Sequence, residues 1–177
     1  MKTPQTTWTE FRAAFYNALD QVKPEKFLEA WKYGGHNMNP FYAETFMPKV
    51  AANIKLKLHP ERYKRDYTFV NENDVPLILA EVETSHPTAT REIINLCCFC
   101  AQLKVLVLSC DWEATEKSKF LDSWRKIIID HHAAFQMDCL YAIVVGEWQN
   151  EHLIEYSFTL IDTGGNVIEN DKHPVKL

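Results

Sequence analysis

Three acidic residues in the middle of the chain, Asp66, Glu81 and Glu83, have the types and the spacing for metal chemistry. They lie in two segments, 64–70 and 76–84, that are rich in the β-branched and aromatic residues favoured in strands. The residues between these segments, NEND, are turn formers. We therefore expect a β-hairpin to bring the three acids together.

The expected register of this hairpin places the acids on one face of the sheet. With a loop over residues 72–75, the expected opposed pairs are Val70 with Leu77, Thr68 with Leu79, Asp66 with Glu81, and Lys64 with Glu83. Side chains alternate along a strand, and opposed residues share a face. Lys64, Asp66, Glu81 and Glu83 should therefore project to the same side.

Two opposed carboxylates have Cβ atoms only ~5 Å apart and repel each other unless a proton, a basic group or a cation lies between them. Magnesium prefers oxygen ligands and is usually held by one or two carboxylates together with water and substrate phosphate. Asp66 and Glu81 are the expected metal ligands. The alternative is a solvated strand face whose acids pair with Lys64, Lys104 or Arg91.

The elements on the N-terminal side of the hairpin are expected to be helices. Thr7 and Glu10 have capping-box spacing before an amphipathic pattern, and Pro24 opens a second short helix. Asn39 before Pro40 predicts a third helix, which extends to about residue 54.

Helices and strands alternate on the C-terminal side of the hairpin. A helix over 91–102 is followed by a buried strand over 104–110, and a long helix over 114–135 by strands over 139–145 and 153–162. A strand, a helix and a second strand in this order imply a right-handed crossover and at least one parallel pair. The pattern predicts an α/β domain with a mixed sheet.

The composition of the chain predicts one domain in a reducing compartment. With 177 residues and 46% apolar content, the chain is long enough for one buried core and too short for two. Its beginning lacks the apolar core of a signal peptide, and no apolar run approaches a membrane span. Five cysteines without a spaced framework suit a reducing environment. We expect a cytoplasmic protein that does not enter a membrane.

Charge is distributed unevenly along the sequence. The net charge of −5 argues against an indiscriminate nucleic-acid coat, but residues 49–65 contain six basic residues and one acid. This stretch is either a path for a phosphate backbone or a solvated face. The candidate DNA contacts are Lys55, Lys57, Arg62 and Arg65 in this stretch, with Arg91 and Gln102 on the following helix.

The run RDYTF, then LILAEVETS, a helix and KVLVLS resembles the core of the PD-(D/E)xK nuclease-like superfamily, to which many type II restriction enzymes belong. The resemblance covers about residues 44–110. It implies a restriction-endonuclease-like αβββαβ core with a mixed central sheet flanked by helices. Residues 38–165 would then be the core, 1–37 an N-terminal helical extension and 166–177 a C-terminal tail.

Site residues follow from the resemblance by position. Asp66 matches the family aspartate, Glu81 the first motif acid, and Glu83 the place where a lysine usually stands. Some members use an ExE motif with a further glutamate on the preceding helix, for which Glu44 is the candidate. In others the lysine has moved to a neighbouring position, for which Lys64 is the candidate. Loss of catalysis is the third alternative.

The resemblance implies a metal-dependent DNA endonuclease that uses Mg²⁺ or Mn²⁺, in defence or in mobile-element DNA processing. Cutting both strands often needs two sites, so family analogy also implies a homodimer or a larger protein assembly. The alternative function is a catalytically inactive binding or assembly subunit that keeps the fold.

Overall fold

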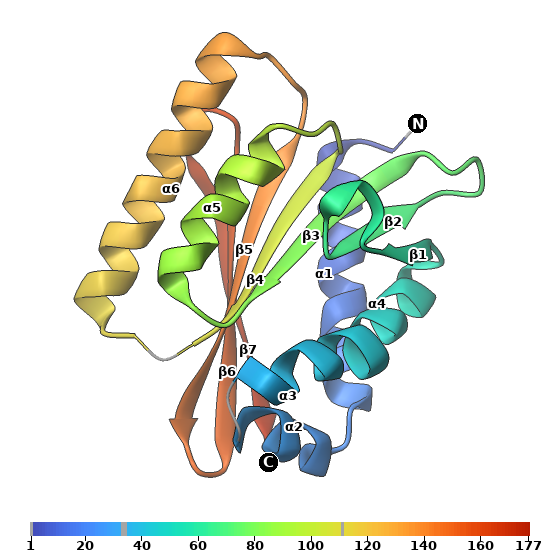
Figure 1. The fold of residues 1–177 in the computed structure, drawn as a ribbon, viewed down its shortest axis with the longest axis vertical. Coiled ribbons are helices and arrows are strands. Elements are labelled where there is room, and N and C mark those ends of the chain that lie inside the picture. The colour runs from blue at the N-terminus through green and yellow to red at the C-terminus, as the bar shows by residue number, and fades with distance from the viewer. Residues whose placement is uncertain (1, 33–34, 111) are drawn as a thin grey trace.

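In the computed structural model, residues 2–32, 35–110 and 112–177 are described, and they form a seven-stranded sheet with helices on both faces (Figure 1). The strands follow one another across the sheet in their order along the chain. They are β1 (Lys57–Pro60), β2 (Tyr67–Val70), β3 (Pro76–Glu83), β4 (Leu103–Ser109), β5 (Leu140–Asn150), β6 (Leu153–Ile161) and β7 (Val167–Lys176).

The sheet is mixed, as the sequence predicts. β1, β2 and β3 are antiparallel neighbours, and so are β5, β6 and β7. The two central pairs, β3 with β4 and β4 with β5, are parallel. Parallel strands need a crossover connection, and α5 (His86–Cys97) and α6 (Ala114–Ala134) provide the two crossovers.

Each face of the sheet has its own layer of helices and its own core. α5 and α6 cover one face. The N-terminal helices cover the other, and they are α1 (Pro4–Gln21), α2 (Pro24–Lys32), α3 (Gly35–Pro40), the π-helix η1 (Phe41–Phe46) and α4 (Met47–Ile54). Aromatic residues of α1, among them Trp8, Phe11 and Phe15, are fully buried against the sheet. The segment expected as an N-terminal extension is therefore part of the main core.

The central strands are the most deeply buried. All seven residues of β4 are buried, which confirms the predicted buried strand. Along β3 the side chains alternate, so Ile78 and Ala80 face the N-terminal helices while Leu79 faces α5. Glu81 and Glu83 share the parity of Leu79 and so belong to the face that α5 covers.

The hairpin differs from the expected one at both ends. Its first strand begins at Tyr67 instead of residue 64, because residues 61–66 form the turn from β1 into β2. The strand β1 was not predicted from the sequence. At the loop end, a register shift after Phe69 brings Val70 opposite Pro76 instead of Leu77.

Two further segments depart from the sequence prediction. The helix expected over 91–102 is α5, which starts at His86 with Pro87 in its first turn and ends at Cys97. Residues after Cys97 return the chain to the start of β4, so Gln102 is not on this helix. The expected C-terminal tail contains β7, which pairs with β6 along its length.

No helix in the described parts of the chain is long and apolar enough to cross a membrane.

Candidate functional site

The acidic residues meet where the β2–β3 ladder ends. The predicted pair Thr68 and Leu79 is confirmed, and the last pair of the ladder is Tyr67 with Ala80. From Glu81 onward, β3 continues without β2 beside it. Backbone donors on this stretch need other partners, because an unpaired buried N–H is costly.

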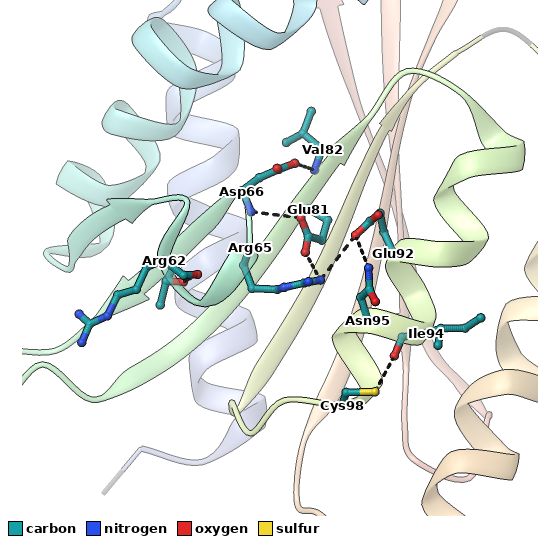
Figure 2. A network of polar contacts seen from close by, with 10 residues as sticks. Arg62, Arg65, Asp66, Glu81, Val82, Glu92, Ile94, Asn95 and Cys98 are labelled. Carbon is teal, nitrogen blue, oxygen red and sulfur yellow. Dashed lines mark hydrogen bonds and ion pairs between the residues drawn. The ribbon is translucent and has the colours of Figure 1, made fainter.

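The carboxylates of Asp66 and Glu81 supply these partners, as Figure 2 shows. The backbone N–H of Asp66 donates to Oε2 of Glu81 at 3.1 Å, and the backbone N–H of Val82 donates to Oδ2 of Asp66 at 2.9 Å. The two side chains thus extend the interaction between the strands beyond the last ladder pair. Asp66 and Glu81 therefore meet through backbone–side-chain hydrogen bonds just beyond the ladder and not as the expected opposed pair within it, and each carboxylate is oriented by a backbone donor.

A buried arginine lies against this pair of acids. The guanidinium of Arg65 forms an ion pair with Glu81 and lies 3.5 Å from Oε2 of Glu92, measured from its Nη1. Arg65 is 6% exposed and Glu81 only 2% exposed. Glu92 also accepts a hydrogen bond from the side-chain amide of Asn95 at 3.1 Å. Arg65 is therefore the basic group that partly neutralises the opposed acids.

Burial, together with the charges of neighbouring acids, raises the pKa values of the carboxyl groups at the site. Burial, together with the charge of Asp66, raises the pKa of Glu81 to about 8 despite the nearby Arg65. Burial also raises the pKa of Asp66 and of Glu83, and the charge of Glu92 acts in the same direction on both. Strongly perturbed carboxylates in contact with one another are typical of functional sites.

One buried atom at the centre of the site, Nε of Arg65, lacks a hydrogen-bond partner. Oε1 of Glu81 is in contact with Nη1 of the same guanidinium. Carboxylate oxygens are the ligands that a hard divalent cation prefers, so the side chains of Asp66 and Glu81 are donors of the right type for Mg²⁺ or Mn²⁺. As they stand, no three His, Cys, Asp or Glu side chains in the described residues are grouped closely enough to hold a metal ion.

Glu83 and Lys64 occupy different environments. Glu83 accepts a hydrogen bond from Oγ1 of Thr88 at 2.8 Å, at the start of α5. Lys64 lies in the short 3₁₀ turn η2 (Arg62–Lys64) with a left-handed φ of 58° and is exposed. The strand register that was expected to set Lys64 beside Glu83 therefore does not form.

Glu44 lies on η1, where its side chain is exposed. It lines a hollow of about 140 Å³ together with Lys26 and Glu29. Asp66 lines a second hollow of about 340 Å³, with Glu61 of the β1–β2 turn and Ala43 of η1. The side chains of Glu44 and Asp66 thus line different hollows, although η1 contributes to both.

The residues expected to contact DNA are spread over the molecule. Arg62 pairs with Asp74 at 2.8 Å and points away from the acidic network in Figure 2. Lys57 is exposed on β1, and Lys55 ends α4 in a left-handed conformation. Arg91 is exposed on α5.

Gln102 and the acidic residues Glu81 and Glu83 lie at opposite ends of the parallel strands β3 and β4. It accepts a hydrogen bond from Oγ1 of Thr7 and donates one to the carbonyl of Lys2, both at 2.6 Å. Gln102 directly precedes β4, whereas Glu83 pairs with Leu108 near the other end of that strand. Gln102 and the acidic site are therefore not brought together.

Sequence reasoning missed Glu92 and assigned Arg65 to a different role. Arg65 appeared to belong to a basic stretch, and no spacing pattern connects it with Glu92, which is 27 residues later. The sequence offers one signal for Glu92: it lies on the helix directly after the strand that carries Glu81 and Glu83. It also stands three residues before Asn95, a spacing that brings two side chains together on a helix.

No protein-family model matches this sequence, and a search of curated proteins finds no match. The chemistry of the site must therefore be inferred from its own geometry.

Proposed function

We propose that this chain is a metal-dependent DNA endonuclease of the PD-(D/E)xK type, which hydrolyses phosphodiester bonds with Mg²⁺ or Mn²⁺. The observation that carries the proposal is the gathering of Asp66, Glu81 and Glu83 where the β2–β3 ladder ends, with Glu81 only 2% exposed and with the basic side chain of Arg65 in contact with it. An excess of buried negative charge favours a bound cation. A role in defence or in mobile-element DNA processing, a cytoplasmic location and a homodimeric state remain predictions.

The order of the elements also supports this proposal. α4 is followed by β1, β2 and β3, then by α5 and β4, which is the αβββαβ order of the PD-(D/E)xK core. Asp66 lies just before the second of these strands and Glu81 and Glu83 lie on the third. Glu81 and Glu83 agree with the family pattern in lying on the third strand, whereas Asp66 directly precedes the second strand instead of lying on it.

The residues divide the chemistry between them. Asp66 and Glu81 would hold the cation, which when bound polarises a scissile phosphate and lowers the pKa of water. The backbone N–H groups of Val82 and Asp66 orient these two carboxylates before any ligand arrives. Glu83 would accept the proton of the attacking water, because its raised pKa makes it a better base than an ordinary glutamate. The leaving group would be the 3′-oxygen of DNA.

The proposal is tested by plasmid nicking with Mg²⁺ or Mn²⁺. Asp66→Asn keeps the size of the side chain but removes its charge, and we expect it to reduce nicking on the order of 100-fold or more. Asp122→Asn on the exposed side of α6 is the matched control and should nick like the wild type. Equal activity of wild type and Asp66→Asn, or no nicking by the wild type with either metal, would contradict the proposal.

The second candidate is a non-catalytic subunit that keeps the fold and binds DNA or another protein. The ion pair between Arg65 and Glu81 favours it, because the guanidinium lies where a cation would bind. The position of Lys64 in η2 also favours it, since no lysine replaces the one that Glu83 lacks. Calorimetry with Mn²⁺ separates the candidates: the absence of binding at millimolar Mn²⁺, with no nicking, is the result expected for the subunit.

A further inference from the structure

We infer that Arg65 is an internal cation that competes with the metal ion for Glu81, and that Glu92 receives its guanidinium when the metal enters. This inference rests on the proposed metal site and concerns how that site is regulated. In the metal-free state Arg65 occupies Glu81, and metal binding moves the guanidinium toward α5.

The position of the guanidinium between two elements is the first support. Glu81 belongs to β3 and Glu92 to α5, and Arg65 reaches between them from the turn that precedes β2 (Figure 2). Its Nη1 contacts Glu81 and lies 3.5 Å from Oε2 of Glu92. A side-chain rotation therefore suffices to exchange one carboxylate for the other.

The quality of the present ion pair is the second support. Nε of Arg65 is buried and has no hydrogen-bond partner. The guanidinium thus meets Oε1 of Glu81 through Nη1 while its Nε stays unused, so the pair lacks the two parallel hydrogen bonds that make a buried Arg–carboxylate pair strong. A divalent cation carries twice the charge and takes carboxylate oxygens as direct ligands, so it competes well for this oxygen.

The third support is that the surroundings of Glu92 can already accept the guanidinium. Asn95 donates a hydrogen bond to Glu92 at 3.1 Å and holds its carboxylate. The ring of Phe99 lies beneath the guanidinium, with 5.1 Å between Cζ of Arg65 and the ring centroid. An aromatic face attracts a guanidinium in either arrangement. Arg65 can therefore leave Glu81 while remaining buried and paired.

The backbone at Arg65 is fixed, so the motion is confined to the side chain. Its N–H donates to the carbonyl of Arg62 at 3.1 Å, and the next residue donates its N–H to Glu81. Because of this competition, the site binds a metal ion more weakly than its carboxylates alone would.

The test is Mn²⁺ titration followed by calorimetry, which does not depend on cleavage. Arg65→Met keeps the length of the side chain but removes its charge, and we expect Mn²⁺ to bind about tenfold more tightly or better, since a buried positive neighbour is lost. Glu92→Gln removes the receiving carboxylate and should weaken Mn²⁺ binding severalfold. Lys119→Met, at an exposed position on α6, is the control and should bind Mn²⁺ like the wild type.

Folding of each variant is checked by circular dichroism, and Arg65→Gln replaces Arg65→Met if the latter does not fold. This inference is overturned if a folded Arg65 variant binds Mn²⁺ as weakly as the wild type or more weakly. If Asp66→Asn also abolishes Mn²⁺ binding, the proposed metal site itself stands. No Mn²⁺ binding by the wild type and by both Arg65 variants overturns the inference and the proposed metal site together. Binding by an Arg65 variant alone supports the inference directly.

Discussion

At the scale of single residues, Glu81 is the most constrained side chain of the site. It accepts a backbone hydrogen bond, pairs with Arg65 and is almost completely buried. Burial outweighs both favourable contacts, because its pKa rises to about 8 instead of falling. Glu81 therefore binds a proton more tightly in the folded protein than in the unfolded chain.

We predict that Glu81→Gln flattens the dependence of stability on pH. A raised pKa contributes stability that is complete below the unfolded pKa of 4.5 and is lost as the pH rises through about 8. Each unit of pKa difference corresponds to about 1.4 kcal/mol, so the wild type should lose up to a few kcal/mol relative to the variant. Urea unfolding at pH 5, 6, 7 and 8 measures this loss.

The control for this prediction is Glu116→Gln on the exposed N-terminal part of α6. Its curve of unfolding free energy against pH should follow that of the wild type. Parallel curves for the wild type and Glu81→Gln would show that folding does not raise the pKa of Glu81.

At the scale of elements, the turn that leads into β2 is strained. Three of its residues, Glu61, Tyr63 and Lys64, have positive φ angles of 55°, 59° and 58°. Left-handed backbone costs a residue with a Cβ roughly 1–2 kcal/mol. The pairing of β1 with β2 compensates for this cost, because Pro60 opposite Tyr67 leaves only six residues to reverse the chain.

We predict that Lys64→Gly raises the free energy of unfolding by up to about 1 kcal/mol. Glycine adopts a positive φ without a steric penalty, although part of the gain is offset by the greater freedom of the unfolded chain. Lys119→Gly on the exposed face of α6 is the matched comparison and should lower stability by about 1 kcal/mol. Chemical unfolding of the two variants gives opposite signs if the turn is strained, and a similar loss in both would refute the strain.

At the scale of the whole molecule, the two cores differ in chemistry. The core under the N-terminal helices is aromatic, with Phe15 in edge contact with Phe46 and Phe158. The core under α5 and α6 contains the fully buried Lys104. Its amine donates to the hydroxyl of Tyr141 at 3.0 Å and to the carbonyl of Cys97 at 3.4 Å. This lysine joins β4, β5 and α5, and it does not neutralise the acids as the sequence allowed.

We predict that Lys104→Met stabilises the protein, and more at low pH than at high pH. Burial lowers the pKa of Lys104, so the unfolded chain binds a proton that the folded protein binds less readily. The wild type therefore gains stability as the pH rises, and the methionine variant lacks this dependence. The expected gain at neutral pH is on the order of 1 kcal/mol.

Thermal unfolding at pH 6 and pH 9 measures the effect, with Lys119→Met on the surface of α6 as the control that should change stability by less than about 0.5 kcal/mol. A loss of stability in Lys104→Met at both pH values would mean that the hydrogen bonds of the amine outweigh its burial.

The local sequence pattern alone was enough to predict the class of the fold and the central residue pairing of the β2–β3 hairpin. The alternation along β3 and the uniformly apolar β4 predicted a mixed α/β sheet and the pair of Thr68 with Leu79. Asp66 and Glu81 also lie close together, although Asp66 precedes β2 and the two are joined by backbone–side-chain hydrogen bonds beyond the ladder. The mixed sheet and the pair of Thr68 with Leu79 follow from residue type and from the two-residue period of a strand, which neighbours in the chain are sufficient to specify.

Only the tertiary structure decided what surrounds the acids. The start of β2 depends on β1, so Lys64 lies in a turn, and Arg65, directly after it, is buried beside Glu81. Glu92 joins the site because α5 packs on the face of the sheet that carries Glu81. Such contacts depend on the residue at which a strand ends and on which helix packs against that strand. Residue spacing within the sequence specifies neither of these.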